Sequence, residues 1–554
     1  MKKCELCNDE KMGTVVAGKY ICNDCYMKAC FIETSSIAYE EWKNSVVFRE
    51  GYNDTIDCRI SEIINSISII HSDLKEQENQ LLVELENEIK ARLQYYQKHE
   101  LIVAFLTIRE IVSRMLLVQK EKTDWIIISD VSSINLLMKM TNVLEEFENH
   151  QIGEWENGCS NLANAICYAA RYNTIVENIA LTFGKDISLN EICFEAVETE
   201  ETKKYFDIYL RNGVDEKPED YKIHNPILNK KLQAETKTPD LILEGLNELL
   251  KKEFGFNRAE YQLLSTCLLR MEFPTEEEYW DFINGKRALF EQCAIYVMEK
   301  TLLEDLCGKK CIQAILDTFS INRNINNHMD SNELELFCFY EVNEMLVFGN
   351  FSFAQTISAF EKFLLSGDYI DIYKTNISKN SMIVKAQRNL SKFFSACVSE
   401  YLYDNGYKLP MEKYLKVKIP RAEIEKIEVN GKNILKDERD LGDIDVLALN
   451  IDRKEILLFE LKFFKPAISS KEMLYKDRSK IVDKEVLSHI KEREKAVKQN
   501  IDEVVKFVLG EYQYGYTVKS ILLTARTNYY AIQEKEVDYL TWSEFIERVE
   551  KRDI

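Results

Sequence analysis

Two carboxylates and a lysine near the end of the chain have the types and spacing of a site for phosphate chemistry. Residues 443–449 and 455–462 are two largely apolar runs separated by a polar turn, which predicts a β-hairpin. Because side chains alternate between the faces of a strand, Glu460 and Lys462 point the same way. Asp445 lies in the facing strand, so three charges can meet on one face. Burying such charges is unfavourable unless they bind a cation or one another, which points to a functional site.

A divalent cation between the two carboxylates would give this cluster a chemical purpose. A metal held by Asp445 and Glu460 would polarise a phosphate and lower the pKa of a bound water. Lys462 would position that water and offset the charge of the pentavalent state. The available ligands are oxygens without soft donors, so the expected ion is Mg²⁺ or Mn²⁺.

The surrounding residues predict an α/β domain over 388–554. A helical pattern ends at Asn405-Gly406, where glycine suits the left-handed turn that closes a helix. Short extended segments, one long amphipathic helix and a further strand come next, and a last strand and a short helix near Trp542 close the chain. In chain order, these are the helix 390–402, the extended segments 416–419, 423–429, 443–449 and 455–462, the helix 487–508, and the strands 519–524 and 537–540.

This arrangement resembles the PD-(D/E)xK nuclease superfamily. The matching elements are Gly442-x-x-Asp445, Glu460-Leu461-Lys462 and the order helix, strands, helix, strand. The resemblance implies a restriction-endonuclease-like fold, Asp445 and Glu460 as metal ligands, Lys462 as the catalytic lysine, and Mg²⁺-dependent hydrolysis of phosphodiester bonds, with DNA favoured over RNA. It covers under a third of the chain.

The resemblance also suggests further site residues. The Pro-Asp pair of the family is absent and residues 442–445 take its place, so Asp443 is a second candidate metal ligand. Members often add a glutamate from the first helix, for which Glu400 is the candidate. A polar residue of the second helix often joins as well, and Gln499 or Lys498 would fit.

The first 30 residues predict a separate metal-binding module. Cys4-x-x-Cys7 and Cys22-x-x-Cys25 are two knuckles whose four thiolates can close a tetrahedral zinc site without an open position, so the zinc would be structural. Such a short segment cannot bury enough surface alone, and metal binding would supply its folding energy. The module resembles small bacterial zinc ribbons. A redox pair is the alternative, and Cys30 is an alternative fourth ligand.

Length, composition and charge limit the folds and functions that the rest of the chain can have. A chain of 554 residues is too long for one core, and scarce glycine and proline favour helices in the middle, predicted as helical regions 31–212 and 213–387 with a polar linker over 213–238. The fold class expected is multidomain α+β: a zinc ribbon, a large all-α middle and the C-terminal α/β domain. The net charge of −21 argues against a basic nucleic-acid coat protein, and the acidic excess lies upstream of Arg388.

Partners and location follow from the same features. The acidic middle could bind a protein partner or regulate the nuclease, and a sensor joined to a nuclease suggests restriction or anti-phage defence. Scattered single cysteines are typical of reduced thiols, and neither a signal peptide nor a membrane helix is visible, so the expected location is cytoplasmic and no membrane partner is expected.

Two other functions remain open at this point. The nuclease fold could be catalytically inactive and act as a nucleic-acid or protein-binding module, or the enzyme could be directed at RNA. The charged hairpin could also be a salt-bridged surface feature. Basic residues between 465 and 498 alternate with acidic ones, which fits either a phosphate-guiding surface or a solvated helix face.

Overall fold

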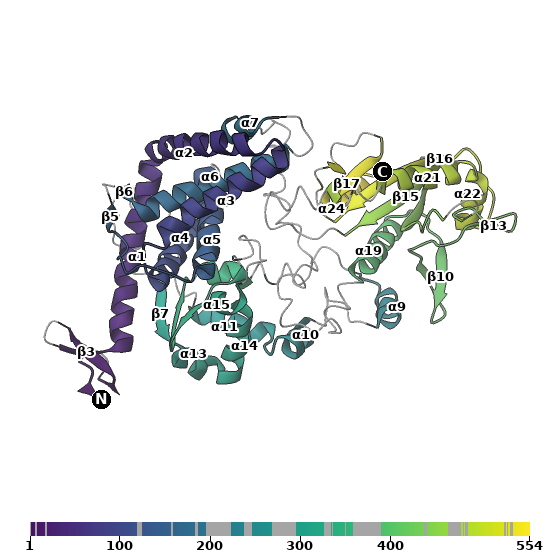
Figure 1. Cartoon of the computed structure of the whole chain (residues 1–554). Helices are drawn as coiled ribbons and strands as arrows, with labels where there is room; N and C mark the ends of the chain where they lie inside the picture. Colours follow the sequence, from purple (N-terminus) through teal and green to yellow (C-terminus); the bar gives the residue numbers. More distant parts are fainter. Residues whose placement is uncertain are drawn as a thin grey trace. The chain divides into compact units, whose positions relative to one another are not determined.

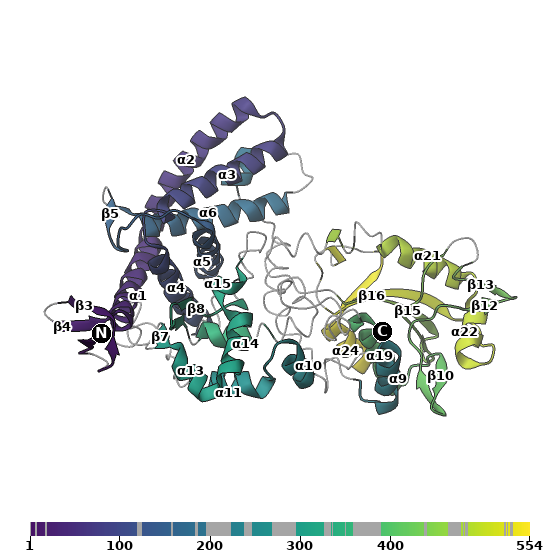
Figure 2. The same ribbon diagram turned by 60° about the horizontal axis from the view of Figure 1, so that its bottom comes forward.

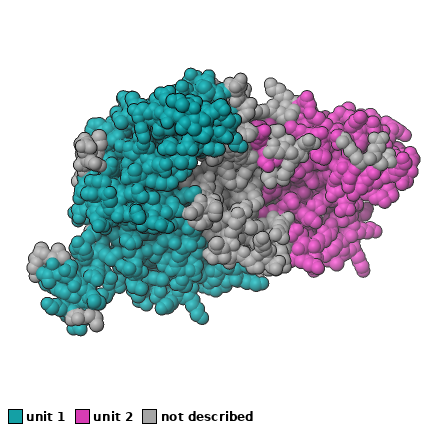
Figure 3. All heavy atoms as spheres, in the orientation of Figure 1, with its two compact units in different colours: residues 1–197, 250–360 teal, residues 198–249, 361–554 magenta. Residues whose placement is uncertain are grey.

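The chain forms two compact units, which are described separately. Unit 1 comprises residues 1–197 and 250–360, and unit 2 comprises residues 198–249 and 361–554 (Figure 3). The computed structural model describes residues 2–5, 8–16, 19–118, 125–156, 159–182, 187–195, 223–237, 246–268, 295–325, 334, 336–349, 351–357, 360, 389–436, 440–463, 478–479, 481, 486–525, 528, 530–531 and 536–554.

Unit 1 is mainly helical (Figure 1). Both predicted middle regions, 31–212 and 213–387, contribute to it. Its described elements are β1 (Lys2–Lys3), β2 (Glu10–Lys11), β3 (Gly13–Val16), β4 (Lys19–Cys22), α1 (Asn23–Val47), α2 (Arg49–Ile70), α3 (Leu74–Leu93), α4 (Lys98–Val118), α5 (Trp125–Val143), β5 (Trp155–Glu156), β6 (Cys159–Ser160), α6 (Asn161–Leu181), α7 (Leu189–Phe194), α11 (Arg258–Leu268), β7 (Tyr296–Glu299), α13 (Lys300–Cys307), α14 (Lys309–Phe319), α15 (Ile321–Asn324), β8 (Tyr340–Val342) and β9 (Met345–Phe348), while α10 (Leu246–Glu253) crosses the boundary between the units.

Helix α4 lies at the centre of unit 1. It packs against α1 and α5, and its residues 101–112 are buried. The buried carboxylate of Glu110 accepts hydrogen bonds from the backbone N–H groups of Phe351 and Ser352, each at 2.8 Å, and pairs with Arg114 at 2.6 Å. These bonds satisfy a charge inside the core and tie α4 to the segment that follows β9. No helix among the described residues is long and apolar enough to cross a membrane.

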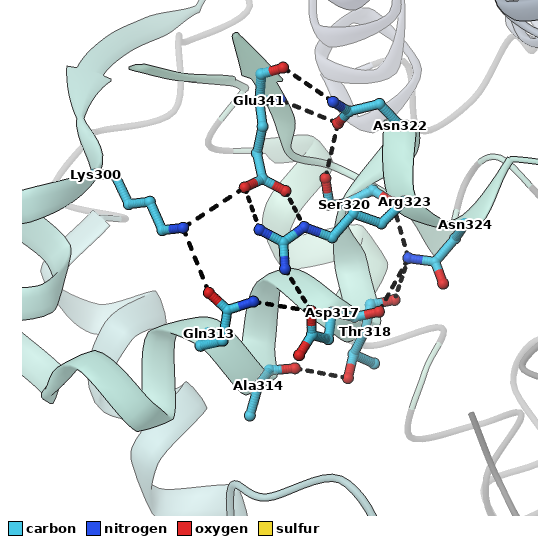
Figure 4. Close-up of polar contacts among 10 residues, drawn as sticks. All are labelled: Lys300, Gln313, Ala314, Asp317, Thr318, Ser320, Asn322, Arg323, Asn324 and Glu341. Atoms are coloured by element: carbon cyan, nitrogen blue, oxygen red, sulfur yellow. Dashed lines mark hydrogen bonds and ion pairs between the residues drawn. The ribbon is translucent and has the colours of Figure 1, made fainter. Parts of the chain in front are cut away.

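A three-stranded antiparallel sheet in the order β7-β9-β8 completes unit 1. Figure 4 shows the polar cluster that joins it to the neighbouring helices: Glu341 of β8 pairs with Lys300 at 3.8 Å and with Arg323, which also pairs with Asp317. Two cations balance two carboxylates here, so the cluster neutralises itself and holds β8 to α14 and α15.

The predicted all-α middle is therefore corrected to a mixed one. The runs 340–342 and 345–348 are short and almost fully buried, so they lack the apolar–polar alternation by which a strand is recognised in a sequence. Asn343, with φ of +54°, makes the turn between them. The described chain as a whole is multidomain and mixed α+β, as its length and its pattern of helical and extended segments predict.

Unit 2 is built around one sheet (Figures 1 and 2). Its described elements are α9 (Pro226–Thr236), α19 (Leu390–Asp404), β10 (Met411–Tyr414), β11 (Val417–Pro420), β12 (Glu428–Val429), β13 (Lys432–Asn433), β14 (Val446–Asn450), β15 (Glu455–Lys462), α21 (Val486–Lys498), α22 (Ile501–Leu509), β16 (Thr517–Thr524), β17 (Asp538–Thr541) and α24 (Trp542–Glu550).

The sheet has four strands in the order β14-β15-β16-β17. β14 and β15 are antiparallel, whereas β15, β16 and β17 are parallel, because α21 and α22 carry the chain from β15 back to the start of β16. One face packs against α9, α19 and α24, and the other packs against α21 and α22. The sheet is thus covered on both sides, which explains why β14 and β15 are continuous apolar runs.

Two sequence predictions in unit 2 need correction. Part of the predicted linker 213–238 is helix α9, because the Asn225 side chain accepts from the N–H groups of Ile227 and Leu228 and Pro226 suits the first turn. Residues 213–222 lie outside the described residues. The single helix predicted over 487–508 is two helices, α21 and α22, separated by a turn at 499–500.

Candidate active site

Asp445, Glu460 and Lys462 lie at one end of the sheet, on the face covered by α21. Leu458 of β15 packs in the core beneath α21 and α22, whereas Phe459 and Leu461 pack in the core on the opposite face. Glu460 and Lys462 therefore share the α21 face. Asp445 directly precedes β14, where Val446 is paired with Phe459, so it lies opposite Glu460.

The Asp445 carboxylate is held by backbone groups. The Oδ2 atom accepts a hydrogen bond from the N–H of Leu461 at 2.7 Å, and the backbone carbonyl oxygen of Asp445 accepts one from the N–H of Glu423 at 2.8 Å. Burial raises the pKa of Asp445, and the charge of Glu460 raises it further, while the Leu461 bond and the cations nearby lower it only in part. The carboxylate is thus positioned, and its charge is incompletely compensated.

Glu460 is the most tightly bound member of the group. It is only 7% exposed. Its Oε1 accepts from the Lys462 ammonium at 2.6 Å and its Oε2 pairs with the Arg493 guanidinium. Burial alone would raise the pKa of Glu460, but the charges of Lys462 and Arg493 outweigh burial and hold this pKa below its usual value. Glu460 is therefore an ionised carboxylate in the interior.

Arg493 is a site residue that the sequence does not single out. From α21 it pairs with Glu460 and donates from Nε to the carbonyl oxygen of Leu441 at 2.8 Å. Arg493 thereby joins α21 to Glu460 of β15 and to the loop that leads to Asp445. In the sequence it is one basic residue in the mixed-charge stretch 465–498, and only its position on the inner face of α21 distinguishes it.

The structure places the other candidates elsewhere. Glu400 is buried in α19, where its carboxylate accepts hydrogen bonds from the N–H groups of His224 and Asn225 at the start of α9. Glu400 thus joins α19 to the residues directly before α9, and no contact between Glu400 and the cluster is present among the described residues. Gln499 is exposed in the turn after α21, and the exposed Lys498 pairs with Glu494.

Asp443 and Glu423 lie at the margin of the site. Asp443 is exposed, two residues before Asp445. Glu423 is half-buried, and burial raises its pKa, with Lys392 lowering it and Asp443 raising it. In the sequence Glu423 is only one residue of a predicted extended segment, 423–429, and in the structure that segment forms a strand at 428–429 alone. These two carboxylates are close enough to interact, so they are additional oxygen donors beside Asp445.

The N-terminal cysteines form a second cluster. The sulfur atoms of Cys4, Cys22 and Cys25 all lie within 4.8 Å of one another, a geometry that could hold a metal ion. The Cys22 N–H points to the sulfur of Cys4 at 3.3 Å. Cys7, the fourth predicted ligand, lies outside the described residues. Gly13 of β3 faces Cys22, and a Cβ there would lie 2.1 Å from the Ile21 carbonyl oxygen, so only glycine permits this close strand pairing.

Comparisons with known proteins do not assign this chain to a family: no family model, no curated protein and no solved structure matches it.

Proposed function

We propose that unit 2 is a metal-dependent nuclease that hydrolyses phosphodiester bonds, with DNA as the favoured substrate. The observation that carries the proposal is the meeting of Asp445, Glu460 and Lys462 on one face at the end of β15. The order of α19, β14, β15, α21 and β16 supports it further, since it follows the helix–strands–helix–strand order of the PD-(D/E)xK nucleases that the sequence resembles.

The residues present fit a hard divalent cation. Asp445 and Glu460 offer carboxylate oxygens, and the raised pKa of Asp445 marks a negative charge that a further cation would stabilise. Bound between them, Mg²⁺ or Mn²⁺ would polarise the phosphate and lower the pKa of a water. The chain's own contribution is to orient these oxygens, through the Leu461 N–H and the Arg493 guanidinium.

Lys462 would act on the substrate side of the cluster. Its side chain is 32% exposed, whereas that of Glu460 is 8% exposed, so the ammonium group is the part of the pair that reaches solvent. A cation there would attract the phosphate and stabilise the charge that develops as water attacks. Arg493 is more enclosed and serves to position Glu460.

The test is cleavage of supercoiled plasmid, single-stranded DNA and RNA with Mg²⁺ or Mn²⁺. Asp445→Ala and Lys462→Ala should abolish cleavage. Asp443→Ala tests whether the exposed Asp443 carboxylate contributes to cleavage as an additional metal ligand. Lys498→Ala is the matched control, because this lysine is exposed on the same unit and pairs with Glu494. Circular dichroism would verify folding. An inert wild type with every substrate and metal, or full activity in both site variants, would refute the proposal.

A second candidate function is a non-catalytic binding module with the same fold. The observation that favours it is that both oxygens of Glu460 already have cationic partners within the chain, Lys462 and Arg493. Metal titration separates the two functions. An enzyme should bind Mn²⁺ through Asp445 and Glu460, whereas a binding module held together by its own ion pairs should bind nucleic acid without any metal.

We also propose that the N-terminal cluster binds structural zinc. Support comes from the three convergent sulfur atoms and from the CxxC spacing that adds Cys7 as a fourth thiolate. Metal analysis of the purified chain should find one zinc per chain, lost in Cys22→Ser. Retention of zinc in that variant would contradict the assignment.

A further inference from the structure

The hairpin formed by β10 and β11, residues 411–420, concentrates positive charge in an acidic protein. It projects from the body of unit 2 (Figure 1). Residues 408–421 include five basic side chains and one acidic one, although the whole chain has a net charge of −21. The acid is Glu412, and it is paired with Lys231 of α9. The five basic residues are Lys408, Lys413, Lys416, Lys418 and Arg421.

The lysines near the tip are exposed and are not balanced by neighbouring acids. Lys413 and Lys418 are cross-strand partners, and like charges directly opposite each other destabilise a hairpin. Among the described residues, the ion pairs do not include Lys413, Lys416 or Lys418. By contrast, on the neighbouring β12–β13 hairpin Lys426 pairs with Glu428 at 2.6 Å and Lys436 pairs with Asp440 at 3.6 Å. An external anion at the first hairpin would relieve this repulsion.

The turn of this hairpin also departs from the residues that its geometry favours. Leu415 and Lys416 have φ values of +48° and +68°, a conformation that two-residue turns usually give to asparagine and glycine. Leu415 is 59% exposed at the tip. Backbone strain of this kind is concentrated at functional sites, including segments that clamp a ligand.

The base of the hairpin is joined to the candidate active site. Lys408, before the hairpin, is paired with Leu449 at the end of β14, and Ile424, after it, is paired with Ile444. The N–H of Glu423 donates to the Asp445 carbonyl oxygen at 2.8 Å. A strand of four or five residues extends about 15 Å from this base. A duplex that contacts the hairpin lysines would therefore be long enough to reach Asp445 as well, although Tyr414 and Ile419 of the hairpin pack on the face of the sheet that α9 and α19 cover.

We propose that the β10–β11 hairpin is a nucleic-acid-binding arm that holds the phosphate backbone of duplex DNA beside the site. Lys413, Lys416 and Lys418 would contact successive phosphates, and Leu415 at the tip would pack against the sugars and bases of a groove. This inference rests on the proposed nuclease function for its choice of polyanion. It assigns two steps to different residues: the hairpin binds the DNA backbone, and Asp445 and Glu460 hold the metal.

The experiment measures binding of a fluorescein-labelled DNA duplex to the full chain by anisotropy, in EDTA to prevent metal-dependent cleavage, over a series of salt concentrations. The test variant is the triple substitution Lys413→Gln, Lys416→Gln and Lys418→Gln. The matched control, in the neighbouring hairpin, is the triple substitution Lys426→Gln, Lys432→Gln and Lys436→Gln. Both remove three positive charges from exposed positions of unit 2.

We expect the test variant to bind at least about tenfold more weakly at low salt, with a slope of log affinity against log salt that is smaller by roughly 3, because each lysine–phosphate contact contributes about 0.9. The control should change the slope much less. Unchanged affinity and slope in the test variant, an equal loss in the control, or no duplex binding by the wild type would overturn the proposal. Tighter binding by the test variant would overturn it too.

Failure of the arm and failure of the nuclease proposal give different results. If wild type cuts DNA and the test variant binds and cuts equally well, the arm is refuted while the nuclease stands. If wild type never cuts but the test variant loses duplex binding, the arm stands and unit 2 is a binding module.

Discussion

Replacing Arg493 by methionine should lower the stability of the metal-free site and increase the stabilisation that the site gains from Mg²⁺. Arg493, whose side chain is 12% exposed, contributes a charged hydrogen bond to Glu460 and a second bond, of 2.8 Å, to the Leu441 carbonyl oxygen. A hydrogen bond to a charged group contributes about 1.5–3 kcal/mol and an ordinary one about 1 kcal/mol. Because Lys462 still pairs with Glu460, the full penalty of an orphaned buried charge does not apply. The expected loss is roughly 2–4 kcal/mol.

Amide hydrogen exchange of peptides covering β14 and β15 measures this loss locally, which matters in a chain with two units. In EDTA, a loss of about 2 kcal/mol corresponds to roughly 30-fold faster exchange where opening limits the rate. Mg²⁺ should then protect Arg493→Met more than wild type, because the guanidinium no longer competes for Glu460. At a Mg²⁺ concentration 100 times the Kd of a protein, metal binding stabilises that protein's site by about 2.7 kcal/mol.

The control is Lys498→Met on the same helix, which removes an exposed pair with Glu494 and should change exchange by less than about 1 kcal/mol. Exchange in Arg493→Met that matches wild type in EDTA would refute the positioning role of Arg493. Equal protection of both proteins by Mg²⁺ would refute the competition between the guanidinium and a metal.

Three further predictions concern other parts of the chain. Gly13→Ala should lower the zinc content measured by atomic emission, because the new Cβ would meet the backbone of β4. Gly51→Ala should retain the zinc, because nothing lies within 4 Å of a Cβ added there, and equal zinc in both variants would contradict the prediction. Asp445→Asn in EDTA should gain stability relative to wild type as the pH rises from about 5 to about 8. Burial and Glu460 raise the pKa of the Asp445 carboxyl group, so in wild type the stability associated with its protonated form is lost as the pH passes through the raised pKa. Urea midpoints of the two proteins that stay parallel across this pH range would refute the shift. Leu415→Asn with Lys416→Gly should slow exchange in residues 411–420 through about 1–2 kcal/mol of relieved backbone strain, and faster exchange would show that the turn is not strained.

The sequence predicts the centre of unit 2 well because its signals are local. The pairing of β14 with β15 follows from two apolar runs and a polar turn, and the end of α19 follows from Asn405-Gly406, with Gly406 at φ of +93°. Alternation along β15 then places Glu460 and Lys462 on one face. These inferences depend only on the chemistry of neighbouring residues.

Contacts between residues far apart in the chain could not be predicted in this way. Arg493 reaches Glu460, 33 residues away in the chain, because α21 packs against the sheet beside β16, and no local pattern in the sequence indicates that contact. Glu400 has the residue type of a metal ligand, but the N-terminus of α9 offers it two N–H groups instead. That α9 packs there at all is invisible in a polar, proline-containing stretch that reads as a linker.

The position of α9 has a consequence for how the molecule is made. The chain contributes α9 to unit 2, then supplies residues 250–360 to unit 1, and only afterwards makes the sheet that α9 covers. His224 and Glu400, which join α9 to α19, are 176 residues apart, so the contact that completes unit 2 forms late during synthesis. A fragment beginning at residue 388 would lack Leu228 and Leu232 in its core and would leave the Glu400 carboxylate without its N–H donors. Unit 2 can therefore be completed only after residues 250–360 of unit 1 have been synthesised.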